Sequence, residues 1–285
     1  MEIKIIGVLG AGLMGRGIAQ VAAQAGYTVI MRDIEDRFVE GGLSAIDSFL
    51  KVSVEKGKMT EEEKKAIMGR IKGTTKLEDL KDVDFVIEAV SENMNLKKEV
   101  FRSLDELTRK EVILATNTSS LSITDIATAT KRPDKVVGMH FFNPVPLMKL
   151  VEIIRGYYTS DETVAITTEL SKRFGKETVE VKKDIPGFLV NRLLIPHFLE
   201  AISLYEKGIG TKEDIDKAAK LGLNYPMGPF ELMDLLGNDT TYAIIEYFYN
   251  NLDKELKWSI PYTFRALVQA GRYGRKTKAG WYDYK

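Results

Sequence analysis

Short apolar runs alternate with amphipathic segments through the first two thirds of this 285-residue chain. The apolar runs have the length and β-branched content of buried strands, and the segments between them repeat apolar residues at helical spacing. We expect strands at residues 3–9, 28–33, 84–90, 112–116, 136–140, 147–154 and 178–182. We expect helices at residues 16–26, twice within 35–71, at 94–108 and near 161–174. This alternation predicts an α/β fold with a doubly wound, mostly parallel sheet.

The pattern changes at the segment DIPG, residues 184–187, and is mostly helical from there to the end. We therefore predict two domains, residues 1–184 with the sheet and residues 185–285 with helices alone. The helices predicted for the second domain carry more apolar surface than a domain of about 100 residues needs to cover itself. This excess favours a homodimer formed through the C-terminal domain.

Composition narrows the class of protein. Lys plus Arg and Asp plus Glu number 41 each, so the net charge gives no reason to expect binding to nucleic acid or to a membrane surface. The chain has no cysteine, which excludes disulfides, thiolate metal sites and a cysteine nucleophile, and we expect no metal ion. No signal peptide precedes the first strand, and no apolar run reaches the roughly 18–20 residues of a membrane-spanning helix. We expect a cytoplasmic protein.

A glycine-rich turn follows the first predicted strand and opens a helix inside a strand–helix–strand unit. In this context the turn predicts a dinucleotide-binding loop, with the pyrophosphate at the helix N-terminus. The loop residues expected to bind the cofactor are Gly10, Ala11, Gly12, Leu13, Met14 and Gly15. Asp33 ends the second strand, where it would accept from both ribose hydroxyls and repel a 2′-phosphate. The cofactor expected is NAD, although Arg32 beside Asp33 leaves NADP open.

His140 is one of only two histidines and ends the apolar run that begins at Val136. The loop FFNPVP separates it from a second apolar run with Glu152 in its middle. A carboxylate in an apolar strand needs a partner, because burial of an unpaired charge is costly. An imidazole is the natural partner, and the pair would act as a base held in one tautomer by an acid. The alternative is a structural histidine, with Glu152 paired to Lys149 or Arg155.

Polar residues follow two other predicted strands, at the edge where open α/β sheets bind ligands. Glu92 and Lys97 come just after the third strand, near the expected path of the nicotinamide half of a dinucleotide. Asn117 and Ser119 follow the fourth strand. Ser119 lies too early to cap the next helix, so we expect it to contact the substrate and Asn117 to contact the cofactor.

Other polar residues fit both a functional and a structural explanation. Lys51, Lys56 and Lys58 are either a solvated helix face or contacts for the phosphates of a large anionic substrate. Lys276 is either a cofactor contact or part of a solvated basic tail. Asn191 is the notable polar residue of a long helix whose other residues suit burial.

These features together resemble the L-3-hydroxyacyl-CoA dehydrogenases, most closely the short-chain 3-hydroxybutyryl-CoA dehydrogenases. The resemblance runs the whole length of the chain, through the segments GAGLMGRGIAQ, RDIEDRFV, NTSSLSIT, ATKRPDKVVGMHFFNPVPLMKLVEII, IPGFLVNRLL, EDIDKAAKLGLNYPMGPFELMD and GRKTKAGWYDY. It implies an N-terminal Rossmann-type domain that binds NAD, a helical C-terminal dimerisation domain and an acyl-CoA substrate.

The resemblance also implies a reaction, the interconversion of 3-hydroxyacyl-CoA and 3-oxoacyl-CoA by hydride transfer with NAD. His140 matches the catalytic histidine of the family and Glu152 its acidic partner. Ser119 and Asn191 match the residues that hold the substrate near its reacting oxygen. Preferred acyl length and physiological direction, in β-oxidation or in butyrate formation, are not readable from the residues.

Other residues of this sequence also match functional positions of the family. Glu92, Lys97 and Lys276 match residues that contact NAD. Lys56 matches a lysine near the CoA moiety, and Lys51 lies one position from where a second is expected.

Three alternatives share parts of the pattern. A dehydrogenase of a free hydroxy acid or sugar acid would share the glycine loop but act without CoA. A non-catalytic, crystallin-like protein would keep the fold and bind NAD, but the intact set of His140, Glu152, Ser119 and Asn191 argues against it. A module of a larger multifunctional β-oxidation enzyme is disfavoured because the chain stops soon after its helical region.

Overall fold

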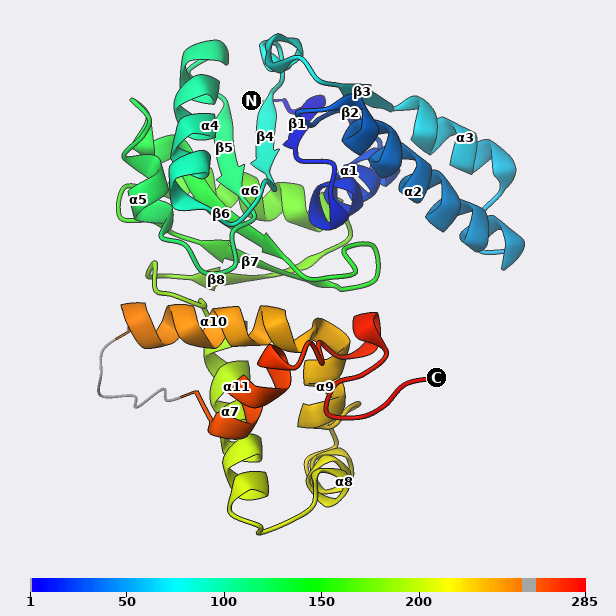
Figure 1. Cartoon of the computed structure of the whole chain (residues 1–285). Coiled ribbons are helices and arrows are strands. Elements are labelled where there is room, and N and C mark those ends of the chain that lie inside the picture. Colours follow the sequence, from blue (N-terminus) through cyan, green and yellow to red (C-terminus); the bar gives the residue numbers. More distant parts are fainter. Residues whose placement is uncertain (1, 253–259) are drawn as a thin grey trace. The chain divides into compact units, whose positions relative to one another are not determined.

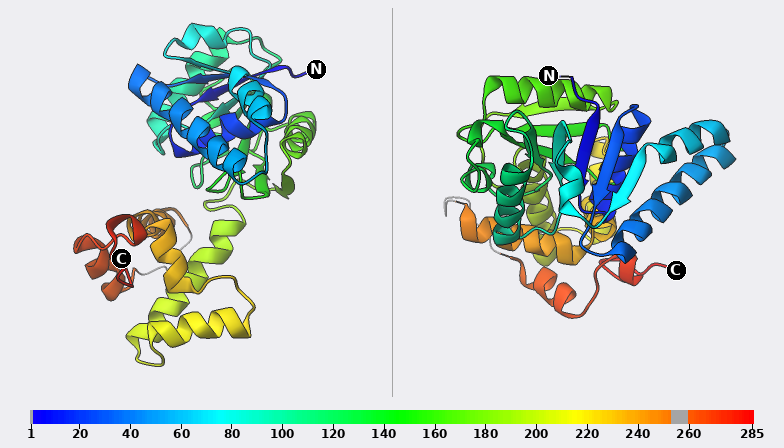
Figure 2. Two further views of the ribbon diagram at one scale, coloured as in Figure 1. Left: turned by 90° about the vertical axis from the view of Figure 1, so that its right-hand side faces the viewer. Right: turned by 90° about the horizontal axis from the view of Figure 1, so that it is seen from above.

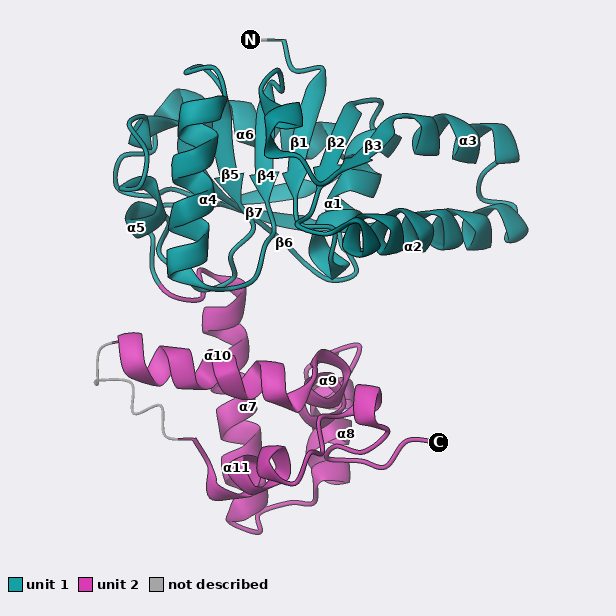
Figure 3. Ribbon diagram, turned by 45° about the horizontal axis from the view of Figure 1, so that its top comes forward, with its two compact units in different colours: residues 1–185 teal, residues 186–285 magenta. Residues whose placement is uncertain are grey.

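A computed structural model describes residues 2–252 and 260–285. The chain divides into two compact units, residues 1–185 and 186–285 (Figure 3). Among the described residues, no helix is long and apolar enough to cross a membrane. A cytoplasmic location stays a prediction.

The first unit is built on one eight-stranded sheet in the order β3-β2-β1-β4-β5-β6-β7-β8 (Figure 1). Its strands are β1 (Ile5–Leu9), β2 (Thr28–Arg32), β3 (Ile71–Thr74), β4 (Phe85–Glu88), β5 (Ile113–Thr116), β6 (Val136–Phe141), β7 (Leu150–Ile154) and β8 (Glu177–Val181). All neighbouring pairs are parallel except β6 and β7. The prediction of a doubly wound, mostly parallel sheet is confirmed.

Helices cover both faces of this sheet, so the strands β4, β5 and β6 are buried along their whole length. The helices are α1 (Leu13–Gln24), α2 (Asp36–Glu55), α3 (Glu61–Gly69), α4 (Met94–Leu107), α5 (Ile123–Ala127) and α6 (Asp161–Arg173), with short 3₁₀ turns at Leu77–Leu80 and Pro133–Lys135. Tyr27, just after α1, packs edge-on against Phe174, just after α6, with ring centroids 5.7 Å apart. In the view from above, Figure 2 shows α6 and α4 on opposite sides of the strands.

The edge strand β3 is absent from the strands predicted by the sequence. Its sequence, IKGT, has one apolar residue and no alternation that would identify it. Pairing with β2, where Val29 is opposite Ile71, supplies the hydrogen bonds that make this segment a strand. A Cβ on Gly73 would lie 2.4 Å from a methyl carbon of Val39, so the glycine allows α2 to pack closely on the strand. Tertiary contacts therefore decide this element.

The second unit is helical, as predicted. Its helices are α7 (Val190–Glu206), α8 (Lys212–Gly222), α9 (Pro229–Leu236), α10 (Asn238–Asn251) and α11 (Tyr262–Gln269), with a 3₁₀ turn at Arg275–Thr277. Trp281 anchors the C-terminal tail by packing edge-on against Phe230 and stacking on Phe264. The buried carboxylate of Asp234 accepts from the backbone N–H of Trp281 at 2.8 Å and from the hydroxyl of Tyr284 at 2.8 Å. The tail is thus part of the core of this unit.

Candidate active site

His140 and Glu152 form a buried pair on neighbouring strands. The loop between β6 and β7 reverses the chain, so the two residues lie directly opposite each other in the antiparallel register. Nδ1 of His140 is 2.7 Å from Oε2 of Glu152. Glu152 is fully buried and His140 is 6% exposed, with its ring 4.6 Å from the ring of Phe142. The predicted pairing of the histidine with Glu152 is present in the structure.

The contact with Glu152 determines which ring nitrogen of the neutral imidazole carries the proton. An ionised carboxylate only accepts hydrogen bonds, so Nδ1 of His140 carries the proton and donates it to Glu152. Nε2 is then the basic nitrogen of the ring. A histidine oriented in this way by a carboxylate has the geometry of a general base.

The glycine loop between β1 and α1 has the shape needed to approach a pyrophosphate. Gly10 has a φ of 97°, a conformation that a side chain would strain. A Cβ on Gly15 would lie 1.8 Å from the carbonyl oxygen of Gly10, so only glycine lets the helix begin so close to the strand. A Cβ on Gly12 would meet nothing within 4 Å. The backbone there is open to a ligand at the helix N-terminus.

Asp33, just after β2, fits the ribose-binding role. Its Oδ2 accepts from the backbone N–H of Ala11 at 2.7 Å, which places the carboxylate against the glycine loop. The neighbouring Arg32 donates through Nε to the carbonyl of Thr75 at 3.2 Å. Leu13, which begins α1, is 54% exposed beside the open loop, and Met14 packs against the core. The residues present therefore fit NAD.

Asn117 connects the end of β5 with the end of β6. Its side-chain Oδ1 accepts from the backbone N–H of Phe141 at 2.8 Å, next to His140. Its own backbone N–H donates to the carbonyl of Glu88 at 2.7 Å. Asn117 therefore lies at the strand edge that carries the imidazole, and its contact with the cofactor stays a prediction.

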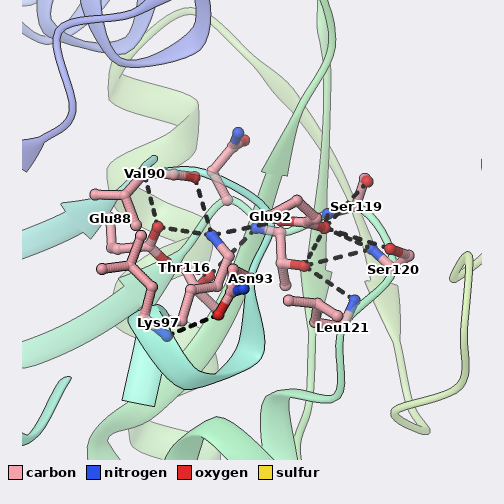
Figure 4. A network of polar contacts seen from close by, with 12 residues as sticks. Glu88, Val90, Glu92, Asn93, Lys97, Thr116, Ser119, Ser120 and Leu121 are labelled. Atoms are coloured by element: carbon pink, nitrogen blue, oxygen red, sulfur yellow. Dashed lines mark hydrogen bonds and ion pairs between the residues drawn. The ribbon is translucent and has the colours of Figure 1, made fainter. Parts of the chain in front are cut away.

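Glu92 reaches from the loop after β4 to the loop after β5. One carboxylate oxygen accepts from the hydroxyl of Thr118 at 2.5 Å and from the backbone N–H and the hydroxyl of Ser119 at 2.9 and 3.2 Å (Figure 4). Burial by itself would raise the pKa of Glu92, but the ammonium of Lys97 and the hydrogen bonds from Thr118 and Ser119 together lower it. Ser119 is thus held by a carboxylate that stays ionised at neutral pH.

The sequence-based prediction missed the partner of Lys97. Lys97 is 1% exposed, and its Nζ is 2.7 Å from Oε1 of Glu88, which is fully buried at the end of β4. The argument that identified Glu152 applies equally to Glu88, a lone carboxylate in the apolar run DFVIEAV. That signal was available in the sequence.

The remaining predicted residues lie apart from this edge or in the second unit. Lys51 and Lys56 are exposed on the C-terminal half of α2 and at its end. Asn191 belongs to the second unit, near the start of α7, where it is 9% exposed. Lys276, also in the second unit, pairs with Asp239 at 2.6 Å. A functional role for these four residues stays a prediction.

Five segments therefore meet at one edge of the sheet: the glycine loop, Asp33, the loop with Glu92, the loop with Asn117 and Ser119, and His140. Parallel strands bring their carboxyl ends to the same edge, where open α/β sheets bind ligands. A dinucleotide loop and a histidine oriented by a carboxylate, on the same edge of the sheet, fit a nicotinamide-dependent oxidoreductase.

Comparisons with known proteins agree. Residues 5–185 match the family model described as 3-hydroxyacyl-CoA dehydrogenase, NAD binding domain, and residues 187–284 match the C-terminal domain of the same family. The chain belongs to the 3-hydroxyacyl-CoA dehydrogenase family and is an NAD-dependent oxidoreductase.

Individual relatives cover the chain almost completely. A 3-hydroxybutyryl-CoA dehydrogenase of Clostridioides difficile is 48% identical over 98% of this chain and 99% of its own length. The mitochondrial hydroxyacyl-coenzyme A dehydrogenase of Homo sapiens is 44% identical over 99% of this chain and 92% of its own. The crystal structure of an (S)-3-hydroxybutyryl-CoA dehydrogenase from Ralstonia eutropha matches with a TM-score of 0.95 and 45% identity, and covers 100% of both chains.

Proposed function

We propose that this chain interconverts (S)-3-hydroxyacyl-CoA and 3-oxoacyl-CoA with NAD(H), and that its preferred pair is 3-hydroxybutyryl-CoA and acetoacetyl-CoA. The observation that carries the proposal is the buried contact of His140 with Glu152, 2.7 Å long, at the sheet edge that carries the dinucleotide loop. The short-chain preference is supported by relatives of Clostridioides difficile and Ralstonia eutropha, both of which are named 3-hydroxybutyryl-CoA dehydrogenases.

In the oxidising direction Nε2 of His140 takes the proton of the substrate's 3-hydroxyl. Glu152 keeps the ring in the required tautomer and stabilises the imidazolium that forms. Bound NAD supplies the acceptor, or in reverse the donor, of the hydride at C3. In the reducing direction the imidazolium donates its proton to the ketone oxygen. General acid–base catalysis of this kind contributes roughly 10²–10⁴-fold to the rate.

Polar side chains complete the proposed site. Ser119 and Asn191 hold the reacting oxygen of the substrate, and Ser119 can do so because Glu92 fixes its backbone. Glu92, Lys97, Asn117 and Lys276 contact the cofactor, and Lys51 and Lys56 face the CoA phosphates. Contacts in and beside the loops after β4 and β5 support the roles of Ser119, Glu92, Lys97 and Asn117. The roles of Asn191, Lys276, Lys51 and Lys56 rest on the family resemblance alone.

We also infer that residues 1–184 bind NAD and that residues 185–285 form the substrate and dimerisation domain. Large apolar side chains are exposed in the second unit, and their concentration favours a protein interface. They include Leu193, Ile209, Leu221, Leu223 and Leu235, with exposed fractions of 77, 68, 77, 58 and 47%. A homodimer would cover this surface.

The activity is tested by following NADH absorbance with acetoacetyl-CoA, with NADPH and free acetoacetate in parallel and with the variant His140→Ala. We expect turnover that needs the CoA thioester, prefers NADH and falls by about 10²–10⁴-fold in the variant. Turnover of free acetoacetate at an equal rate would instead favour a dehydrogenase of free acids. Tight NADH binding without turnover of any substrate would favour a non-catalytic protein.

The dimer is tested by light scattering on the purified chain and on the variant Leu221→Glu. We expect a mass of two chains for the wild type and of one for the variant, because a buried charge without a partner opposes association. Tyr157→Glu is the control, since Tyr157 is 83% exposed in the first unit. A wild type of one chain mass at the concentrations of the assay contradicts the proposal.

A further inference from the structure

Glu88 is a buried carboxylate at the end of β4 for which the proposed reaction has no direct use. It is 0% exposed, and donors satisfy both of its oxygens (Figure 4). Oε1 accepts from Nζ of Lys97 at 2.7 Å and from the backbone N–H of Val90 at 2.7 Å. Oε2 accepts from the hydroxyl of Thr116 at 2.7 Å. Glu88 therefore joins β4, the loop that follows it, α4 and β5.

Lys97 is the residue through which Glu88 reaches the site. Its ammonium has three hydrogens and three acceptors: Oε1 of Glu88 at 2.7 Å, Oε2 of Glu92 at 3.4 Å and the carbonyl of Val90 at 3.4 Å. A lysine that is 1% exposed would be unstable there without a counter-charge. The contact with Glu88 is the shorter of its two ion pairs, and it fixes where the ammonium lies.

Glu92 connects the buried ammonium of Lys97 to the loop that carries Ser119. Lys97 holds one of its oxygens, and the other accepts from the backbone N–H groups of Ser119 and Ser120, at 2.9 and 3.3 Å, as well as from Thr118. A chain of polar contacts 2.7, 3.4 and 2.9 Å long thus runs from Glu88 through Lys97 and Glu92 to the loop that carries Ser119. Chains of hydrogen bonds in a low-dielectric interior reinforce one another.

We propose that Glu88 is a positioning residue, which acts through Lys97 to hold Glu92 and the Ser119 loop in the geometry that binds the nicotinamide half of NAD and the substrate oxygen. The substrate part rests on the proposed function, whereas the NAD part rests on the cofactor of the family alone. Glu88 does not touch the reacting atoms, and its role is to pre-organise groups that do.

The rival explanation is that Glu88 only stabilises the fold, and the same strand offers a control for it. Asp84 precedes β4 at its opposite end, where it accepts from the backbone N–H groups of Lys4 and Ile5, both at 2.9 Å, and pairs with Arg109 at 2.6 Å. Asp84 therefore also holds strands together, but at the edge away from the cofactor loop. Its loss should affect stability alone.

The test is a double-mutant cycle with Glu88→Gln, Lys97→Met and the double variant, with Asp84→Asn beside it. NADH dissociation constants, kcat and KM for acetoacetyl-CoA, and thermal unfolding are measured for each. We expect Glu88→Gln to raise the NADH dissociation constant and to lower kcat, each by about 10-fold or more, because small displacements of positioned groups are costly. We expect the double variant to equal Lys97→Met within about twofold, because coupled residues are not additive.

Asp84→Asn should lower the unfolding temperature and leave the NADH dissociation constant and kcat within about twofold of the wild type. The proposal would be overturned if Glu88→Gln left the NADH dissociation constant and kcat unchanged. It would also be overturned if the effects of Glu88→Gln and Lys97→Met multiplied in the double variant. If Glu88→Gln does not fold, Thr116→Val keeps both charges and should raise the NADH dissociation constant in the same direction, less strongly. An unchanged constant in that folded variant also overturns the proposal.

The measurement of NADH binding distinguishes failure of this proposal from failure of the proposed reaction. A wild type that binds NADH without turning over acetoacetyl-CoA would end the substrate assignment, while the binding cycle would still decide the role of Glu88. Conversely, full turnover in the wild type with no coupling between Glu88 and Lys97 would leave the reaction intact and remove the positioning role.

Discussion

His140 and Glu152 are direct cross-strand neighbours in the antiparallel pair of β6 and β7, and Nδ1 of the histidine lies 2.7 Å from the carboxylate. Residues opposite each other in such a pair have Cα atoms about 4.5–5.5 Å apart, so the backbone itself holds the two side chains within reach. The carboxylate that contacts the imidazole is therefore part of the sheet and needs no flexible loop. This is the one antiparallel pairing in the sheet.

The first prediction concerns the charge of Glu152. Glu152→Gln keeps the size of the side chain but no longer favours the imidazolium or one tautomer. We expect kcat with acetoacetyl-CoA to fall by up to the roughly 10²–10⁴-fold expected for loss of the base itself, with the NADH dissociation constant unchanged. The matched control is Glu177→Gln on the neighbouring strand β8, an exposed residue whose loss should leave kcat unchanged. A drop in kcat below about tenfold for Glu152→Gln would contradict the orienting role.

The second prediction separates folding from cofactor binding at the glycine loop. Gly12→Ala adds a Cβ that meets nothing within 4 Å, so the variant should fold with an unchanged unfolding temperature. It should nevertheless bind NADH at least about tenfold more weakly, because the methyl group occupies the approach to the helix N-terminus. Gly15→Ala should lose stability as well, since its Cβ would lie 1.8 Å from the oxygen of Gly10.

Gly41→Ala is the control for both variants. Gly41 is exposed inside α2, and a Cβ there also meets nothing within 4 Å. Removing a helical glycine should stabilise the chain by about 0.5–1 kcal/mol and leave NADH binding unchanged. Calorimetry and fluorescence titration with NADH measure the two quantities. NADH affinity of Gly12→Ala equal to that of Gly41→Ala would argue against pyrophosphate binding at this loop.

The third prediction concerns the choice between NAD and NADP. Asp33→Asn removes the charge that faces a 2′-phosphate and weakens the hydrogen bond from Ala11. We expect the NADH dissociation constant to rise about tenfold, equivalent to about 1.4 kcal/mol of binding free energy. We also expect the ratio of the NADPH to the NADH dissociation constant to decrease. Asp36→Asn, three residues on and exposed at the start of α2, should change neither constant. An unchanged ratio of the NADH and NADPH constants in Asp33→Asn would mean that Asp33 does not select the cofactor.

The fourth prediction follows from the pKa of Asp84. Burial raises this pKa, but the backbone N–H groups of Ile5 and Lys4 and the guanidinium of Arg109 outweigh it, so the pKa lies below its ordinary value of 3.8. A lowered folded-state pKa contributes stability that is complete above 3.8 and is lost as the pH falls through the folded-state pKa. Asp84→Asn should therefore unfold more easily than the wild type at about pH 7, and the difference should shrink at about pH 3. Urea unfolding at both pH values measures it, and a gap that is constant with pH would contradict the assignment.

Much of the fold follows from local sequence features. The alternation of apolar runs with helical periodicity predicts the strands of the inner sheet and the helices between them. The starts of two helices also depend on local residues, because the side chains of Thr60 and Ser122 each cap the helix that follows. These features lie within a few residues of one another, so they can be read directly.

The chemistry of the site was also largely readable, for a different reason. A carboxylate within an apolar strand signals a partner, because an unpaired buried charge costs too much. That reasoning pairs Glu152 with an imidazole, and it applies equally to Glu88, where the partner is a lysine nine residues along the chain. Such a signal states that a partner exists but does not identify it.

What the sequence determined by itself is therefore the class of fold, the dinucleotide loop and the candidate side chains of the site. The tertiary structure alone decided that IKGT becomes the edge strand β3, that β7 runs antiparallel with Glu152 opposite His140, and that Glu88 and Glu92 share Lys97. Strand register and the pairing of buried charges depend on which groups meet when distant segments pack together. Local periodicity does not identify these contacts, because each strand or charged side chain could pair with several others until the sheet is assembled.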